Sequence, residues 1–223
     1  MHQGTETMAG GLGEGEEKRL GDYCIVRELG RCGLGKVFEA FQESLGRRVA
    51  LKVLPGSFAL DPKRVERFRR EARATARLHH PSIVPVYEVG EAEGTHFYSM
   101  EYIDGPSLDE VIAGRKKEAE EQGGKKDSPA SDPAYIAEVV SGFAGLVEGV
   151  EEAHRAGLIH RDIKPSNILQ DKSGRWVLVD FGLVHEEAAH TITRSGEMIG
   201  TVSYMSPEQV SRRKVDARSD VYS

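Results

Sequence analysis

The chain has 223 residues, enough for one ordinary domain or two small lobes with a buried core. Its 39% hydrophobic content excludes wholesale disorder, and a formal net charge of −6 argues against non-specific nucleic-acid binding. Two cysteines cannot form a disulfide scaffold and indicate a reducing, cytoplasmic compartment, while no apolar run approaches the roughly 18 residues that a membrane span needs.

Residues 1–19 are rich in glycine and glutamate and lack the basic and apolar regions of a signal peptide. We expect a disordered tail here, with structure beginning near Leu20. From Tyr23 to Leu54, β-prone runs alternate with glycine-containing turns, which predicts an antiparallel meander. The three predicted strands cover residues 23–29, 36–41 and 48–54.

A helix is predicted next, because Asp61 can cap it and Pro62 suits its first turn. Apolar residues then recur at helical spacing, and these are Val65, Phe68, Ala72 and Ala76. Two further β-prone runs, 83–89 and 96–102, complete a strand-rich lobe that we expect to span residues 20–103.

The remaining residues, 104–223, predict a mainly helical lobe, so the expected fold class is α+β. Residues 114–132 mix charge runs with Gly, Ser and Pro, which predicts a low-complexity surface insertion. A long helix is expected from Pro133 to about Ala156, with Gly157 placed to end it. Its predicted buried stripe consists of Ile136, Val139, Val140, Phe143, Val147 and Val150.

Two charged residues fall on faces that should be buried. Alternation along strand 48–54 places Lys52 on the same face as Ala50, although a lone strand lysine is more often a snorkelling edge residue. Glu71 shares the inward face of the predicted helix, where an unpaired carboxylate would be costly. Because Lys52 is the nearest cation by topology, we predict that it meets Glu71.

Three glycines, Gly30, Gly33 and Gly35, lie in a turn between two predicted strands, where they would let backbone N–H groups approach an anion. Alone, such a turn is more typical of an ordinary hairpin. Because Lys52 follows Gly35 by 17 residues, the combination favours bound phosphate.

The strongest pattern lies in the second half, where HRDIKPSN occupies residues 160–167 and DFG occupies residues 180–182. Together with LGRCGLGKV, VALK, GTVSYMSPE and DARSDVYS in this order, they resemble the protein kinase family, specifically the eukaryotic-like Ser/Thr kinases of bacteria. The resemblance runs from about Leu20 to Ser223, apart from the 114–132 insertion. It implies a bilobal fold, with an antiparallel sheet plus one helix in the N-lobe and a mainly helical C-lobe.

The resemblance also implies ATP and Mg²⁺ as cofactors and a role for each matched residue. Asp162 matches the catalytic aspartate that orients the substrate hydroxyl and accepts its proton. Lys164 matches a γ-phosphate contact that is typical of Ser/Thr kinases. Lys52, held by Glu71, matches the lysine that holds the α- and β-phosphates.

Metal and nucleotide positions follow by the same resemblance. Asn167 and Asp180 match the residues that supply the oxygen ligands of Mg²⁺. The backbone of Glu101 and Ile103 matches the hinge that binds adenine, and Met100 before it matches the gatekeeper. The full set of matched nucleotide-binding positions is Leu29, Gly30, Gly33, Gly35, Val37, Ala50, Lys52, Met100, Glu101, Ile103 and Leu169.

Arg161 precedes Asp162, and in kinases with this pairing a phosphate on the activation loop usually meets the arginine. The activation loop spans about residues 183–208. Its phosphorylation candidates are Thr193, Ser195 and Thr191. The resemblance therefore implies protein substrates and, for autophosphorylation, self-association, with no nucleic-acid partner and no membrane segment in the chain.

The sequence departs from the family pattern in three places. Cys32 replaces the usual second glycine of the glycine-rich loop, and Ser206 replaces the usual alanine. Related kinase domains continue for several helices beyond the segment that ends here at Ser223, so we expect an incomplete C-lobe with exposed apolar surface. Asp220 matches the residue that braces the HRD backbone, and its helix would be short.

The leading interpretation is therefore a protein Ser/Thr kinase. An inactive truncated kinase or an ATP-binding pseudokinase scaffold is the main alternative, although the presence of Lys52, Glu71, Asp162, Asn167 and Asp180 together argues against degeneration. A small-molecule phosphotransferase is disfavoured by GTVSYMSPE, which is similar to a protein-substrate platform. Many relatives carry a membrane span and a sensor after the kinase domain, so a membrane-anchored parent stays open.

Overall fold

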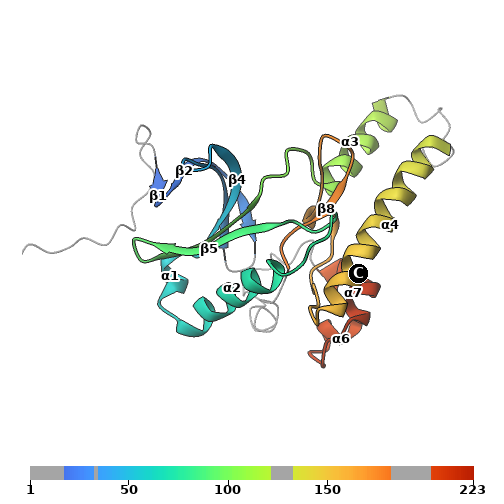
Figure 1. Ribbon diagram of the computed structural model, residues 1–223. Coiled ribbons are helices and arrows are strands. Elements are labelled where there is room, and N and C mark those ends of the chain that lie inside the picture. Colours follow the sequence, from blue (N-terminus) through green and yellow to red (C-terminus); the bar gives the residue numbers. More distant parts are fainter. Residues whose placement is uncertain (1–17, 33–34, 122–132, 182–201) are drawn as a thin grey trace, which may run out of the picture.

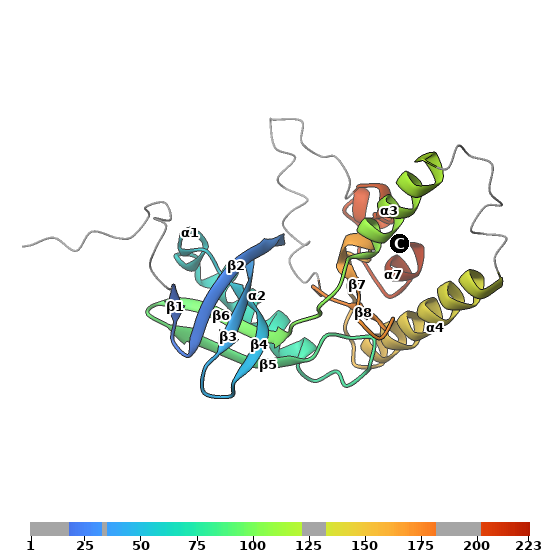
Figure 2. The same cartoon turned by 90° about the horizontal axis from the view of Figure 1, so that it is seen from above.

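The structure is a computed structural model that describes residues 18–32, 35–121, 133–181 and 202–223. Two lobes follow each other along the chain, first a curled sheet with two helices, then a mainly helical lobe (Figure 1). The segment after the last strand of the sheet runs across to the helical lobe, as seen from above in Figure 2. The expected bilobal α+β fold is confirmed.

The first lobe contains a six-stranded antiparallel sheet with the order β1-β2-β3-β4-β6-β5. The antiparallel meander predicted for residues 23–54 is confirmed, because β2, β3 and β4 pair in sequence. The strands are β1 (Arg19–Leu20), β2 (Tyr23–Cys32), β3 (Gly35–Gln42), β4 (Arg47–Val53), β5 (Val86–Ala92) and β6 (Thr95–Glu101).

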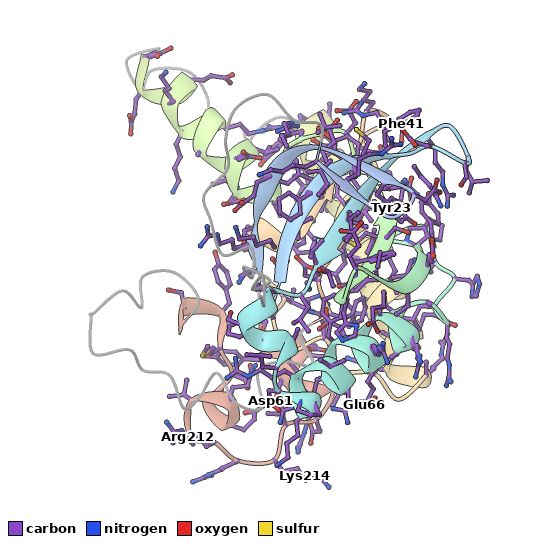
Figure 3. The ribbon with its side chains drawn as sticks, turned by 90° about the vertical axis from the view of Figure 1, so that its left-hand side faces the viewer. Tyr23, Phe41, Asp61, Glu66, Arg212 and Lys214 are labelled. Carbon is purple, nitrogen blue, oxygen red and sulfur yellow. The ribbon has the colours of Figure 1, made fainter. Side chains whose placement is uncertain are left out.

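Two helices accompany this sheet, α1 (Gly56–Ala59) and α2 (Pro62–Thr75). Asp61 lies at the start of α2, where its carboxylate accepts a hydrogen bond from the Lys63 N–H, so the predicted cap is confirmed (Figure 3). Ala76, expected in the buried stripe, is exposed just beyond the helix end, and Thr75 is buried instead.

The helical lobe begins with α3 (Leu108–Glu121), which includes residues 114–121 of the predicted low-complexity insertion, so this part is helical rather than irregular. Its charged residues have good helix propensity, and Lys117 lies 3.9 Å from Glu121 one turn later. Local helix propensity therefore explains why the helix reaches Glu121 although this segment has no apolar periodicity. Residues 122–132 lie outside the described part.

The predicted long helix is confirmed as α4 (Pro133–Arg155), and Gly157 follows it with a φ of +76°. Only two of the six residues of its predicted buried stripe are buried or packed. Val139 and Val150 pack against the core, but the other four side chains, Ile136, Val140, Phe143 and Val147, are exposed.

Glycines explain which face of α4 turns inward. A Cβ on Gly142 would lie 2.6 Å from the Trp176 ring, and a Cβ on Gly145 would lie 2.9 Å from the Ser82 hydroxyl. The helix approaches the strand beneath it closely at these glycines, and Leu146 and Ala153 are buried on the same side. The bulky residues therefore stay outside.

The rest of the helical lobe is built from short elements. A two-stranded antiparallel sheet pairs β7 with β8. The elements are the 3₁₀ turn η2 (Pro165–Asn167), β7 (Ile168–Gln170), β8 (Trp176–Leu178), the 3₁₀ turn η3 (Val202–Tyr204), α6 (Pro207–Val210) and α7 (Arg218–Tyr222). Within the described ranges, every helix is too short or too polar to cross a membrane.

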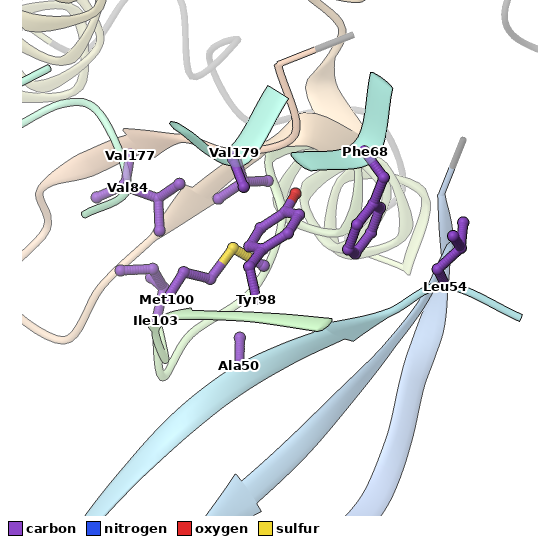
Figure 4. Packing of buried hydrophobic residues seen from close by; sticks show 10 residues of the cluster. Ala50, Leu54, Phe68, Val84, Tyr98, Met100, Ile103, Val177 and Val179 are labelled. Carbon is purple, nitrogen blue, oxygen red and sulfur yellow. The ribbon is translucent and has the colours of Figure 1, made fainter. Parts of the chain in front are cut away.

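A shared apolar cluster joins the two lobes (Figure 4). Ala50 and Met100 come from neighbouring strands of the sheet, where they face each other in register. Val177 and Val179 come from β8 and the residue after it. Because both lobes contribute buried side chains, the sheet and the β7–β8 hairpin hold a common core between them.

The connection between the lobes passes close to β7 at Gly105. A Cβ on Gly105 would lie 1.8 Å from the Gln170 carbonyl oxygen, a clash with backbone that cannot swing away. The next residue strengthens this contact, because the Pro106 carbonyl accepts a 2.9 Å hydrogen bond from the Gln170 N–H.

We therefore expect Gly105→Ala to lower the free energy of unfolding by about 1–3 kcal/mol, the usual cost of overpacking. Urea unfolding measures it. Gly114→Ala is the control, because its Cβ would meet nothing within 4 Å and lies in α3, so it should stabilise by about 0.5–1 kcal/mol. Equal changes in the free energy of unfolding for the two substitutions would contradict a close approach of Gly105 to β7.

Candidate active site

Lys52 lies at the centre of a buried ionic cluster. Its Nζ is 2.9 Å from Glu71 Oε1 on α2 and 3.0 Å from Asp180 Oδ1, which follows β8. The side chains of Lys52 and Glu71 are only 3% and 2% exposed. The contact predicted between Lys52 and Glu71 is confirmed, and the structure adds Asp180 from the other lobe.

The buried Glu71 carboxylate has a second stabilising partner besides Lys52. Burial raises the pKa of the Glu71 carboxyl, while the Lys52 ammonium and the Tyr98 hydroxyl, which donates a 3.0 Å hydrogen bond, act in the opposite direction. Tyr98 was not predicted as a site residue. It lies directly opposite Lys52 in the β4–β6 register, so strand pairing alone could have indicated it.

A second cluster surrounds Asp162. Its Oδ2 is 2.8 Å from the Lys164 ammonium and accepts a 3.0 Å hydrogen bond from Asn167 Nδ2, which also donates to the Asp162 carbonyl. The loop that carries Asn167 is joined to the Asp180 segment, because the Val179 N–H donates to the Asn167 carbonyl at 2.9 Å. The structure therefore places the predicted residues of the second lobe on two linked loops.

The backbone at this site is held in an uncommon conformation. Arg161 has a φ of +68° and Asp180 a φ of +60°, values that residues other than glycine rarely adopt. The buried Asp220 carboxylate on α7 stabilises the first by accepting hydrogen bonds from the N–H groups of His160 and Arg161, at 2.8 and 2.7 Å. Asp220 therefore makes the bracing contacts expected from the sequence.

His160 is a supporting residue that the sequence interpretation left without a role. Burial lowers the pKa of its imidazole. In the neutral ring, Nδ1 accepts from the Asp162 N–H at 3.2 Å, so Nε2 carries the proton and donates to the Val179 carbonyl at 3.1 Å. The ring also packs against Phe181. The position of His160 at the start of HRDIKPSN could have indicated this supporting role.

The structure brings some of the predicted nucleotide positions together. Five belong to or pack against the apolar cluster between the lobes, and these are Val37, Ala50, Met100, Ile103 and Leu169. Leu29 is exposed and lies apart from that cluster. Gly33, Thr191, Thr193, Ser195 and the Cys32 side chain lie outside the described part of the structure.

Gly30 and Gly35, expected in a turn, belong to the strands β2 and β3, and Gly35 lies close to Lys52. A Cβ on Gly35 would lie 3.1 Å from Lys52 Cγ, so even alanine would crowd this side chain. Gly30 pairs with Val37 across the β2–β3 ladder, with open space where its Cβ would be. Gly35 is therefore the glycine whose small size matters beside the buried cation.

The sequence profile described as protein kinase domain matches residues 23–223. The chain belongs to the protein kinase family. It is 38% identical over 215 residues to a probable serine/threonine-protein kinase of Streptomyces coelicolor, covering 93% of this chain and 30% of the relative. It is 40% identical over 202 residues to the serine/threonine-protein kinase PknL of Mycobacterium tuberculosis, covering 90% and 46%. The bacterial Ser/Thr kinase resemblance is thereby confirmed.

Solved structures agree with this family. The crystal structure of the Mycobacterium tuberculosis PknI kinase domain matches with a TM-score of 0.65 and 29% identity, covering 93% of this chain and 73% of that chain. This kinase chain spans less than half the length of the curated relatives described above. The family as a whole uses ATP and divalent metal ions.

Removal of the central cation should expose the cost of the buried carboxylates. We expect Lys52→Met to lower the free energy of unfolding of this kinase chain by about 3–5 kcal/mol, because Glu71 would stay buried without its cation. The double variant Lys52→Met/Glu71→Leu should recover part of this loss. Chemical denaturation measures both.

Lys172→Met is the matched control, since that lysine pairs with Asp104 but its side chain is 79% exposed. Its cost should be about 1 kcal/mol or less, as for other surface ion pairs. A double variant less stable than Lys52→Met would contradict the view that the buried carboxylate is the source of the loss.

Proposed function

We propose that the chain transfers the γ-phosphate of ATP to serine or threonine hydroxyls of proteins. One observation carries this proposal. The buried Lys52 of the sheet meets Asp180 of the other lobe, and the Asp180 segment is hydrogen-bonded to the loop that holds Asp162 and Asn167. A phosphate-binding cation and a proton acceptor thus belong to one connected framework.

The residues of this framework suit the demands of phosphoryl transfer, which needs alignment and neutralisation of negative charge more than covalent chemistry. In this proposal the Asp162 carboxylate orients the incoming hydroxyl and accepts its proton. Lys164, held 2.8 Å from Asp162, neutralises charge on the transferred phosphoryl group. Lys52 holds the other phosphates, and Glu71 keeps it in place.

Asn167 and Asp180 fit the metal site that the family pattern implies. Because the Asn167 amide nitrogen donates to Asp162, its amide oxygen is the atom available to a cation. The Asp180 carboxylate is a second oxygen donor, and two protein ligands are typical of Mg²⁺ sites completed by substrate phosphates and water. Bound Mg²⁺ would neutralise charge on those phosphates. In the described residues no group of three or more His, Cys, Asp or Glu side chains could hold a metal by itself.

Protein substrates, self-association for autophosphorylation and a cytoplasmic place of action are further parts of the proposal. Lys164 favours Ser/Thr specificity, and the relatives are named as serine/threonine-protein kinases. The two cysteines and the use of ATP support a cytoplasmic location. The proposed adenine contacts are the backbone groups of Glu101 and Ile103.

Intact-mass analysis tests the proposed reaction. After incubation with Mg²⁺, ATP and a generic basic protein, we expect a mass gain of one or more phosphates on either protein. Asp162→Asn should slow this gain by about 10²–10⁴-fold, the usual contribution of a positioned general base. Asp109→Asn changes an exposed aspartate at the start of α3 and should leave the rate unchanged. Equal rates in all three proteins would refute the proposal.

Phosphopeptide mapping tests the activation loop. We expect phosphate on Thr193 or Ser195 after incubation with ATP, and none in the Asp162→Asn protein. The double substitution Thr193→Ala/Ser195→Ala should lower activity toward a protein substrate by about tenfold, the scale of one charge-assisted hydrogen bond to Arg161. A fully active enzyme with both residues unmodified would remove this part of the proposal.

A further inference from the structure

The turn between β7 and β8, residues 171–175, is organised by Asp171. Its Oδ1 accepts hydrogen bonds from the Ser173 N–H at 2.8 Å, the Ser173 hydroxyl at 2.6 Å and the Arg175 N–H at 3.0 Å. Burial alone would raise the pKa of Asp171, but these donors and the Arg175 side chain lower it to about 2. The turn is therefore a well-defined platform for the side chain of Arg175.

Arg175 joins three separate parts of the chain. Its Nε donates to Asp171 Oδ2 at 2.8 Å, its Nη1 to the Pro81 carbonyl at 3.2 Å and its Nη2 to Glu101 Oε1 at 3.2 Å. The planar guanidinium presents these donors in a fixed arrangement, which a lysine could not reproduce. None of these contacts belongs to the set of catalytic residues described above.

Two of the three parts already form one unit. The residues after Pro81 are bonded to β8, because the Leu178 N–H donates to the Ser82 carbonyl at 2.8 Å and the Val84 N–H donates to the Leu178 carbonyl at 3.1 Å. Glu101 belongs to the sheet of the other lobe, at the end of β6. The Arg175–Glu101 contact thus adds a side-chain link from that unit to the sheet.

Glu101 also begins the lobe connection, residues 101–107. The same turn contacts that connection again at Asp104, which lies 2.6 Å from Lys172. These ion pairs differ in exposure, because the Arg175 side chain is 34% exposed, whereas those of Arg48 and Lys172 are 47% and 79% exposed. Among the described residues, Arg175 is therefore the least exposed of the three cations that pair with carboxylates of the connection.

We propose that Arg175 is a positioning residue that sets the affinity for ATP, by fixing the lobe connection against the β7–β8 turn. This inference rests on the proposed function, in which the backbone of Glu101 and Ile103 binds adenine. Arg175 does not touch the nucleotide in this arrangement. It reduces the freedom of the backbone that does, so it acts on nucleotide binding and leaves the phosphoryl-transfer groups unchanged.

The test compares the KM for ATP with kcat in Arg175→Met, which keeps an apolar stem and loses all three donors. We expect the KM to rise about fivefold, the scale of one partly exposed charge-assisted hydrogen bond, while kcat stays within about twofold. The calorimetric Kd for ATP should weaken by the same factor, so binding is tested independently of turnover.

Glu101→Gln supplies a second variant that keeps the size of the side chain and removes its charge. We expect it to raise the KM, and the double variant Arg175→Met/Glu101→Gln to raise it no further than Arg175→Met alone, because the two residues act through one contact. Arg155→Met is the matched control, since Arg155 on α4 is also ion-paired, with Glu151, but lies at the surface away from the connection. It should change neither constant.

An unchanged KM and Kd in Arg175→Met would overturn the proposal, as would a parallel fall in kcat or additive effects in the double variant. A lower KM would also overturn it, since the contact would then restrain nucleotide binding. These outcomes leave the proposed function intact when the wild-type chain turns over. Absence of phosphate transfer and of ATP binding in the wild type would refute the function itself, and the positioning role with it.

Discussion

Lys52 is the point on which the rest of the site depends, because it is buried between two carboxylates that arrive from different parts of the chain. Glu71 comes from α2 and Asp180 from the segment after β8. A buried charge without a partner is strongly destabilising, so the sheet, the helix and the second lobe must all be in place together. The ionic contact thereby couples the position of α2 to that of the Asp180 segment.

In the second lobe, hydrogen bonds stabilise two residues whose backbone conformation is unfavourable. Arg161 and Asp180 both adopt left-handed conformations, which persist only when the surroundings specify them. Asp220 on α7 accepts a hydrogen bond from the Arg161 N–H. The neutral His160 ring accepts from the Asp162 N–H and donates to the Val179 carbonyl, next to Asp180. The geometry around Asp162 therefore depends on a residue near the end of the chain that has no part in the chemistry.

Between the lobes, apolar and polar contacts have different tasks. The shared cluster around Met100 and Val179 provides non-directional attraction, which brings the lobes together without defining one angle between them. Hydrogen bonds are directional, and the three donated by the Arg175 guanidinium join the start of the lobe connection at Glu101 to Asp171 and to the Pro81 carbonyl. The combination suits a site in which a nucleotide must lie between two lobes.

Local sequence pattern predicted five of the six strands of the sheet, the capped helix α2 and the contact between Lys52 and Glu71, but it missed β1 and α1. The predicted features follow from local pattern, since strand alternation and helical spacing state which side chains share a face. The kinase motifs added the residues of both loops. Local sequence patterns and motifs therefore predicted most of the fold and most residues of the candidate site.

Only the tertiary structure decided which face of α4 is buried, how Glu71 and Asp180 share one cation, and that Arg175 reaches Glu101. Apolar periodicity predicted a bulky stripe on α4, but the helix packs through Gly142 and Gly145 because small residues permit the closest approach. The contacts of Arg175 join residues 74 and 94 positions apart, and no local pattern specifies such pairs. Their geometry exists only once the lobes have packed.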